Sequence, residues 1–189
     1  MAHSETTSAS VGYRIVERFD PTRPGWPKYV EWSKLAHLTE VVGLDCSLCP
    51  AVVEIDSADD WKHAVHPEIL SAVFDDWKYA KARLPREREV RSLQILAVLR
   101  EPAQDQVREL APSGFDFIGF DLIEEETCIS ALNNCGGFDD VFRPDQLNQR
   151  GLLSDLTVAK DIRFRLREAH PEEPHADCAV WAVWRQRSA

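Results

Sequence analysis

Near the end of the chain, the segment Ala176–Arg185 (ADCAVWAVWR) contains an uninterrupted run of apolar residues. Side chains along a β-strand point to opposite faces of the sheet in turn. As a strand, the segment therefore has two apolar faces, with Val180, Ala182 and Trp184 on one and Ala179, Trp181 and Val183 on the other. A strand that is apolar on both faces is typical of the interior of a sheet. We therefore expect it to lie inside the sheet.

Other apolar runs predict the rest of the sheet. The run LQILAVL at Leu93–Leu99 is long enough for a buried central strand. The segments Phe115–Ile123 and Cys128–Leu132 are expected to form a hairpin, with Glu124–Thr127 as its turn. Strict alternation would place Ile118, Phe120 and Leu122 on one face. Three shorter segments are also expected to be strands: Gly12–Phe19, Thr39–Leu44 and Ala51–Ile55.

Helices are predicted where apolar residues recur every three or four positions. Pro27–Leu38 fits one short helix, and a longer one starts near Pro67 and is stopped by Pro85. Ala103–Leu110 predicts another short helix. A last helix carries the apolar stripe formed by Leu156, Ala159, Ile162 and Leu166.

The order of these elements favours an α+β fold. Strands and helices are interspersed without a regular βαβ rhythm, and at least one hairpin is expected. We predict a single compact domain over residues 12–189, with a mixed or mostly antiparallel sheet packed by about three to four helices. Residues 1–11 are small and polar and predict a disordered N-terminal lead-in.

Composition excludes several classes of protein. The chain has 189 residues, 44% of them apolar, and a net charge of −10. Such acidity disfavours binding to nucleic acids or to anionic membranes, and no apolar stretch is long enough for a transmembrane helix. A disulfide scaffold would contain more cysteines and usually an even number, whereas this chain has five. We therefore expect mostly free thiols and a location in the reducing cytoplasm.

The negative charge is concentrated around the expected hairpin. Residues 111–145 hold eight acidic side chains and one arginine, which accounts for −7 of the net charge of −10. Such a region can attract a basic partner, although a solvated polar turn would have the same composition. The candidate binding residues are Asp121, Glu124, Glu125, Glu126, Asp139, Asp140 and Trp26.

Six tryptophans are many for a chain of this length. Trp26 lies in a Pro-rich loop, where an exposed ring would suit the centre of an interface. Trp32, Trp61 and Trp77 fall on helical stripes, and we expect them in the core.

The cysteines suggest an alternative function. Cys46 and Cys49 form a C-x-x-C pair, and His175 and Cys178 could complete a tetrahedral zinc site. Cys135, in an Asn- and Gly-rich turn, could instead act as a nucleophile with His175 as its base. Small buried side chains at strand ends would explain the same pattern without any chemistry.

No nucleotide-binding, hydrolase, metalloprotease or kinase motif is present in the sequence. The sequence therefore favours a non-enzymatic protein-binding module of the immunity or inhibitor type, with a protein partner that is basic and with no cofactor. The alternative is a small zinc- or thiol-site protein. The sequence does not indicate an oligomeric state.

Overall fold

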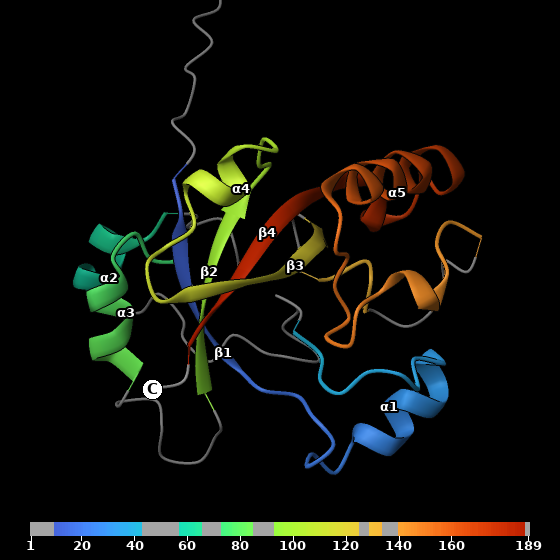
Figure 1. Cartoon of the computed structure of the whole chain (residues 1–189), viewed down its shortest axis with the longest axis horizontal. Coiled ribbons are helices and arrows are strands. Elements are labelled where there is room, and N and C mark those ends of the chain that lie inside the picture. The colour runs from blue at the N-terminus through green and yellow to red at the C-terminus, as the bar shows by residue number, and fades with distance from the viewer. Residues whose placement is uncertain are drawn as a thin grey trace, which may run out of the picture.

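One antiparallel sheet organises the chain (Figure 1). The computed structural model describes residues 10–42, 57–65, 73–84, 93–124, 129–133 and 140–187. Within these ranges the sheet has four strands in the order β1-β2-β4-β3, and every pairing is antiparallel. The strands are β1 (Gly12–Glu17), β2 (Leu93–Arg100), β3 (Phe115–Glu124) and β4 (Cys178–Gln186). The predicted α+β class is confirmed.

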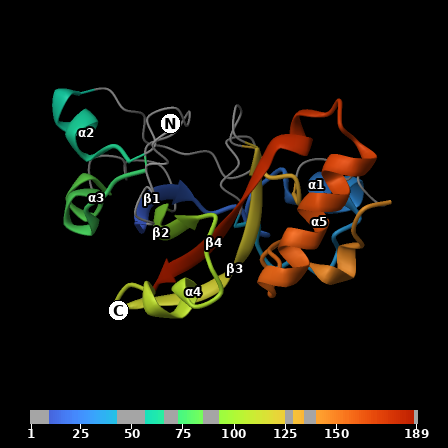
Figure 2. The ribbon, with the colours of Figure 1, turned by 90° about the horizontal axis from the view of Figure 1, so that it is seen from above.

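Five α-helices surround this sheet in the described ranges, where three to four were expected. They are α1 (Trp26–Ser33), α2 (Ala58–His63), α3 (Trp77–Arg83), α4 (Gln106–Glu109) and α5 (Leu156–Ala169), together with the short 3-10 segments η2 (Pro144–Gln146) and η3 (Pro174–Asp177). Helix α3 packs against β1, and α5 packs against β3 and β4 at the opposite end of the sheet (Figure 2). None of the helices in the described ranges is both long and apolar enough to span a membrane.

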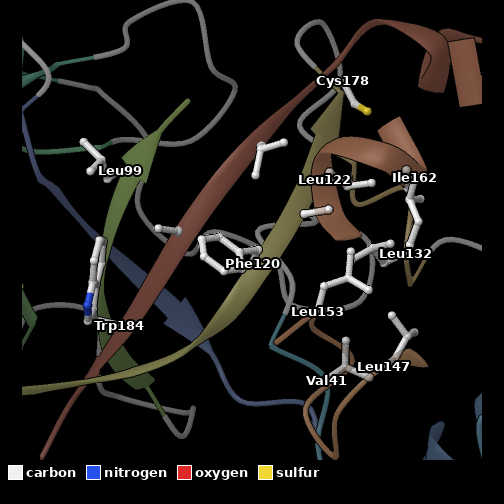
Figure 3. Close-up of a cluster of buried hydrophobic side chains, with 14 of the residues drawn as sticks. Val41, Leu99, Phe120, Leu122, Leu132, Leu147, Leu153, Ile162, Cys178 and Trp184 are labelled. Atoms are coloured by element: carbon white, nitrogen blue, oxygen red, sulfur yellow. The ribbon is translucent and has the colours of Figure 1, made fainter. Parts of the chain in front are cut away.

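The prediction for the last strand is confirmed. Strand β4 lies between β2 and β3, so both of its edges are paired. Its two sets of apolar side chains enter two separate clusters on the two faces of the sheet. Trp181 and Trp184 are both buried, because each face of the sheet has its own core. Figure 3 shows the larger cluster, which runs from Trp184 and Leu99 to Ile162 and Cys178.

Helix α5 follows the prediction closely. Asp155 caps it by accepting hydrogen bonds from the backbone N–H groups of Thr157 (2.7 Å) and Val158 (3.0 Å). The predicted stripe of Leu156, Ala159, Ile162 and Leu166 is buried against the larger cluster. The apolar residues follow a regular helical period over 14 residues, which strongly favours a helix over other secondary structures.

A β-bulge overturns the expectation that Ile118, Phe120 and Leu122 share one face. The register between β3 and β4 shifts between Phe117 and Gly119, so Ile118 joins the smaller cluster while Phe120 and Leu122 join the larger one. An extra residue in one strand reverses the alternation beyond it. Gly119 takes up the distortion with a φ of +144°.

The predicted long helix near residue 67 is shorter than its apolar pattern suggests. Residues 66–72 lie outside the described ranges, and Val73–Asp76 is not helical. Phe74 instead exchanges both backbone hydrogen bonds with Tyr13 of β1, at 2.7 and 2.8 Å. Helix α3 begins only after Asp76, whose side chain caps it. Pairing with the edge strand overrides the local helical period.

Two other strand predictions fall partly or wholly outside the described ranges. In the expected strand Thr39–Leu44, the described part forms a single bridge, from Val41 to Phe19. Ala51–Ile55 and the expected lead-in up to residue 9 lie outside the described residues.

The tryptophan predictions are largely wrong. Trp32 and Trp61, expected in the core, are 52% and 57% exposed. Trp26, expected to be exposed, is buried against Phe19 and Tyr29, with ring centroids 5.5 and 6.1 Å away. Short helices such as α1 and α2 leave most of their surface in solvent. The neighbouring aromatic rings of Phe19 and Tyr29 cover Trp26.

Candidate functional site

The acidic end of strand β3 meets a second acidic segment that lies just before β4. Cross-strand pairing places Glu124 opposite Cys178, so the η3 segment and the loop before it lie beside the end of β3. A pocket of about 240 Å³ forms between them. Its lining consists of Glu124, Pro171, Glu172, Glu173, Pro174, Ala176 and Asp177.

Four of these seven lining residues are carboxylates. Glu124 is 3% exposed, and its Oε2 lies 3.6 Å from Nδ1 of His175. Glu172 and Glu173 are exposed at the rim. Asp177 is also exposed and makes a long ion pair of 3.4 Å with Arg167. The pocket is therefore negative at its base and at its rim.

The backbone around the pocket is held by local hydrogen bonds. The N–H of Glu124 donates to the carbonyl oxygen of Ile129 at 2.9 Å, which turns the chain back at the end of β3. The N–H of Ala176 donates to the carbonyl oxygen of Glu173 at 2.9 Å. Pro171 and Pro174 have fixed φ angles. These constraints limit the movement of Glu124 and of the loop that carries the other carboxylates.

Asp121, another predicted binding residue, lies on the other face of the sheet and is fully buried. Its Oδ1 accepts hydrogen bonds from the Ser130 hydroxyl (2.6 Å) and from the Leu122 N–H (2.9 Å). The Ser130 oxygen in turn accepts one from the N–H of Leu132 at 3.2 Å. This network joins β3 to residues 129–132, so Asp121 stabilises their contact from inside. The described part of the expected strand Cys128–Leu132 forms only a single bridge, from Ser130 to Ile123, followed by a turn.

The remaining predicted binding residues are scattered. Asp140 is exposed, with its Oδ2 2.9 Å from Nε2 of His170 at the end of α5. Trp26 is buried in the cluster beside α1. Glu125, Glu126 and Asp139 lie outside the described residues. Of the predicted set, only Glu124 lines the pocket among the residues that the structure describes.

Glu172, Glu173 and Asp177 were not among the predicted site residues. The sequence signal for them is the acidic run EEPHAD at 172–177, which lies more than 45 positions after Glu124. A count of charges along the chain separates the two acidic segments. Only the antiparallel pairing of β3 with β4 brings them together.

The predicted zinc ligands can be placed only in part. Cys46, Cys49 and Cys135 lie outside the described residues. The structure places His175 beside Glu124 and Cys178 at the first position of β4. Within the described ranges no three His, Cys, Asp or Glu side chains are grouped closely enough to hold a metal ion. The zinc site stays a prediction.

Cys178 is a buried free thiol. Burial raises the pKa of the Cys178 thiol from 9.0 to about 12, and the positive charges of Arg163 and Arg167 offset only part of this effect. Because the thiolate is the reactive form, the thiol is expected to be inert in the folded protein.

We predict that iodoacetamide at pH 8 modifies Cys178 about a thousandfold more slowly in the folded protein than in urea, as expected for a pKa raised from 9.0 to about 12. Peptide mass spectrometry after timed quenching measures both rates. A folded-state rate within tenfold of the unfolded one would contradict the assignment of Cys178 as an inert core residue.

The raised pKa of Cys178 also makes stability depend on alkaline pH. The unfolded thiol loses its proton near pH 9 while the folded one keeps it, so its contribution is complete below pH 9 and is lost as the pH rises toward about 12. Above pH 9 the free energy of unfolding should fall by at most about 1.4 kcal/mol per pH unit through this group. Urea unfolding of the wild type and of Cys178→Ala measures the difference.

The structure thus provides an acidic pocket at one end of β3 and a buried polar network around Asp121. No protein family model matches the chain, and neither a curated protein nor a solved structure shows significant similarity to it.

Proposed function

We propose that this protein acts by binding another protein, and that the acidic pocket between β3 and η3 receives a basic side chain of that partner. The observation that carries the proposal is the convergence of four carboxylates, from two segments far apart in sequence, on one concave surface. Carboxylates on a concave surface concentrate negative potential and attract cations.

Burial of Glu124 makes this attraction selective. A guanidinium group that reached Glu124 would form charge-assisted hydrogen bonds away from bulk water, where such bonds are strongest. Glu172 and Glu173 at the rim would guide the approach of a basic partner over a longer distance. The planar guanidinium of arginine, which can bind two carboxylate oxygens at once, is the best match.

The class of protein we propose is an immunity or inhibitor protein that acts in the cytoplasm on a basic enzyme. Its small size, its net charge of −10 and the lack of catalytic motifs in its sequence support this choice. Masking a basic active site requires only a stable acidic surface, so the protein needs no chemistry or cofactor of its own.

Charge reversal of the rim tests the proposal. The double variant Glu172→Lys/Glu173→Lys should lose capture of a basic protein that the immobilised wild type retains from a lysate of its source organism. With the purified partner, the association rate at low ionic strength should fall at least about tenfold, since electrostatic steering raises such rates by 10- to 1000-fold. Surface plasmon resonance at several salt concentrations measures the rate.

A second double variant, Glu31→Lys/Glu109→Lys, is the matched control. It changes the net charge equally at exposed positions on α1 and α4, away from the pocket lining. This control variant should still bind the partner, and its association rate should depend on salt concentration as that of the wild type does. If both double variants behave alike, the pocket is not the binding site, and if the wild type retains no basic protein, the proposal fails.

The zinc alternative is tested separately by elemental analysis of protein purified without a histidine tag. One zinc ion per chain that is lost in a Cys46→Ser/Cys49→Ser variant would support it. A content well below one per chain would exclude it.

A further inference from the structure

A second concave surface lies at the other end of the sheet, where α4 crosses beside the beginning of β3 (Figure 2). This groove has a volume of about 380 Å³, within the range of small-molecule sites. Its lining is formed by Gln104, Val107, Arg108, Ala111, Phe115, Asp116, Phe117 and Trp184. None of these residues lines the acidic pocket.

Aromatic rings form much of the groove. Phe117 is 39% exposed and packs edge-on against Phe120 and Trp184, with centroids 4.9 and 5.9 Å away. Phe115 is held at the groove by Trp77, at 5.4 Å and an angle of 86°. Rings braced in this way by neighbours present fixed faces and edges, which favour a flat apolar ligand.

Trp184 is a fully buried member of the groove lining. Its side chain is fully buried, and its Nε1 has no acceptor among the residues that the structure describes. Figure 3 shows the indole at the end of the buried cluster, far from Cys178 and Ile162. A buried N–H without a partner is costly, and buried tryptophans usually find one.

The groove lining carries two charged side chains, Arg108 and Asp116. Asp116 is neutralised by Arg187, whose Nε lies 2.8 Å from its carboxylate. Arg108 is exposed on α4 and forms no ion pair with any described residue. The groove therefore offers one uncompensated guanidinium beside an apolar floor.

We propose that this groove binds a small organic anion with a flat apolar body, such as an aromatic carboxylate. The ring of the ligand would lie against Phe117, the exposed aromatic ring of the groove, and its carboxylate would bind Arg108. The site is independent of the acidic pocket, and either proposal can fail without the other.

The test uses 2-naphthoate as the probe, with the neutral 2-naphthamide and the cationic 2-naphthylmethylamine as its analogues. In ¹H–¹⁵N spectra of the labelled protein, 2-naphthoate should shift the indole N–H resonance of Trp184 in a saturable way. The variant Trp184→Phe identifies this resonance by its disappearance. The amide should bind at least fivefold more weakly than the carboxylate, and the amine more weakly still.

Arg108→Gln should weaken 2-naphthoate at least fivefold and leave 2-naphthamide unchanged. Lys160→Gln, which removes the same charge from an exposed position on α5, should change neither affinity. The proposal is overturned if millimolar 2-naphthoate leaves the Trp184 resonance in place, if the three probes bind equally, or if the two charge variants act alike. Equal binding of all three probes would indicate only a general apolar surface.

Discussion

Replacing Asp60 by alanine is expected to lower the free energy of unfolding by about 3–5 kcal/mol, the usual cost of breaking a buried ion pair. Asp60 in α2 is 1% exposed. Its carboxylate accepts hydrogen bonds from the Arg83 guanidinium and the Tyr79 hydroxyl, both on α3. The substitution removes a buried contact between the two short helices and leaves Arg83 buried without this carboxylate.

The same carboxylate stabilises the start of α2. Its Oδ2 accepts from the backbone N–H of Ser57 at 3.0 Å, while the Ser57 hydroxyl accepts from the N–H of Asp60 at 3.1 Å. Loss of this capping box adds to the cost of the substitution. Urea unfolding followed by circular dichroism measures the total.

Asp59→Ala is the matched control for Asp60→Ala. Asp59 is the adjacent residue in α2 and is exposed, and among the described residues its one ion pair is a 3.5 Å surface contact with Lys62. Such pairs contribute about 0–1 kcal/mol. Equal losses for the two variants would show that the buried network around Asp60 does not stabilise the fold.

Gly119→Ala is expected to cost about 3 kcal/mol or more, from backbone strain and overpacking together. Gly119 has a φ of +144°, which side-chain-bearing residues rarely adopt. A Cβ atom there would lie 2.6 Å from Cβ of Leu152 and 2.8 Å from the carbonyl oxygen of Leu153. The second contact is with backbone, which cannot move without breaking the pairing of Phe120 with Leu153.

Gly114→Ala separates the two causes. Gly114 also has a positive φ, of +84°, but a Cβ atom added there would meet no other described atom within 4 Å. It should cost only about 1–2 kcal/mol, the strain of a left-handed residue alone. Thermal or urea unfolding of the two variants gives the comparison, and a Gly119→Ala loss no larger than that of Gly114→Ala would rule out the close approach.

Much of the fold follows from short-range patterns. Strands β2 and β4 and helix α5 were predicted because each has a continuous apolar run or a regular period, and each is buried as expected. The bulge at Ile118 could not be predicted in this way. The need for glycine at 119 arises from Leu152 and Leu153, which are distant in sequence and approach the strand only in the folded chain.

The candidate site was predicted less well. The acidic character of the region around β3 is a property of the sequence, but the burial of Asp121 depends on Ser130 and on the opposite face of the sheet. Trp32 and Trp61 are exposed because of the way α1 and α2 pack in the folded chain. This packing also depends on contacts distant in sequence. The burial of a side chain depends on residues distant in sequence that pack against it, and a local sequence pattern does not identify those residues.

The sequence alone predicts the interior strand at 176–185, because a strand with two apolar faces must be covered on both. It also shows that negative charge is concentrated near residues 111–145. The folded structure decides which of the acidic side chains lie on the same accessible surface. Antiparallel pairing of β3 with β4 places Glu124 beside Glu172, Glu173 and Asp177 and turns Asp121 to the other face. An electrostatic site depends on distances through space and on exclusion of water, and both are set by strand register.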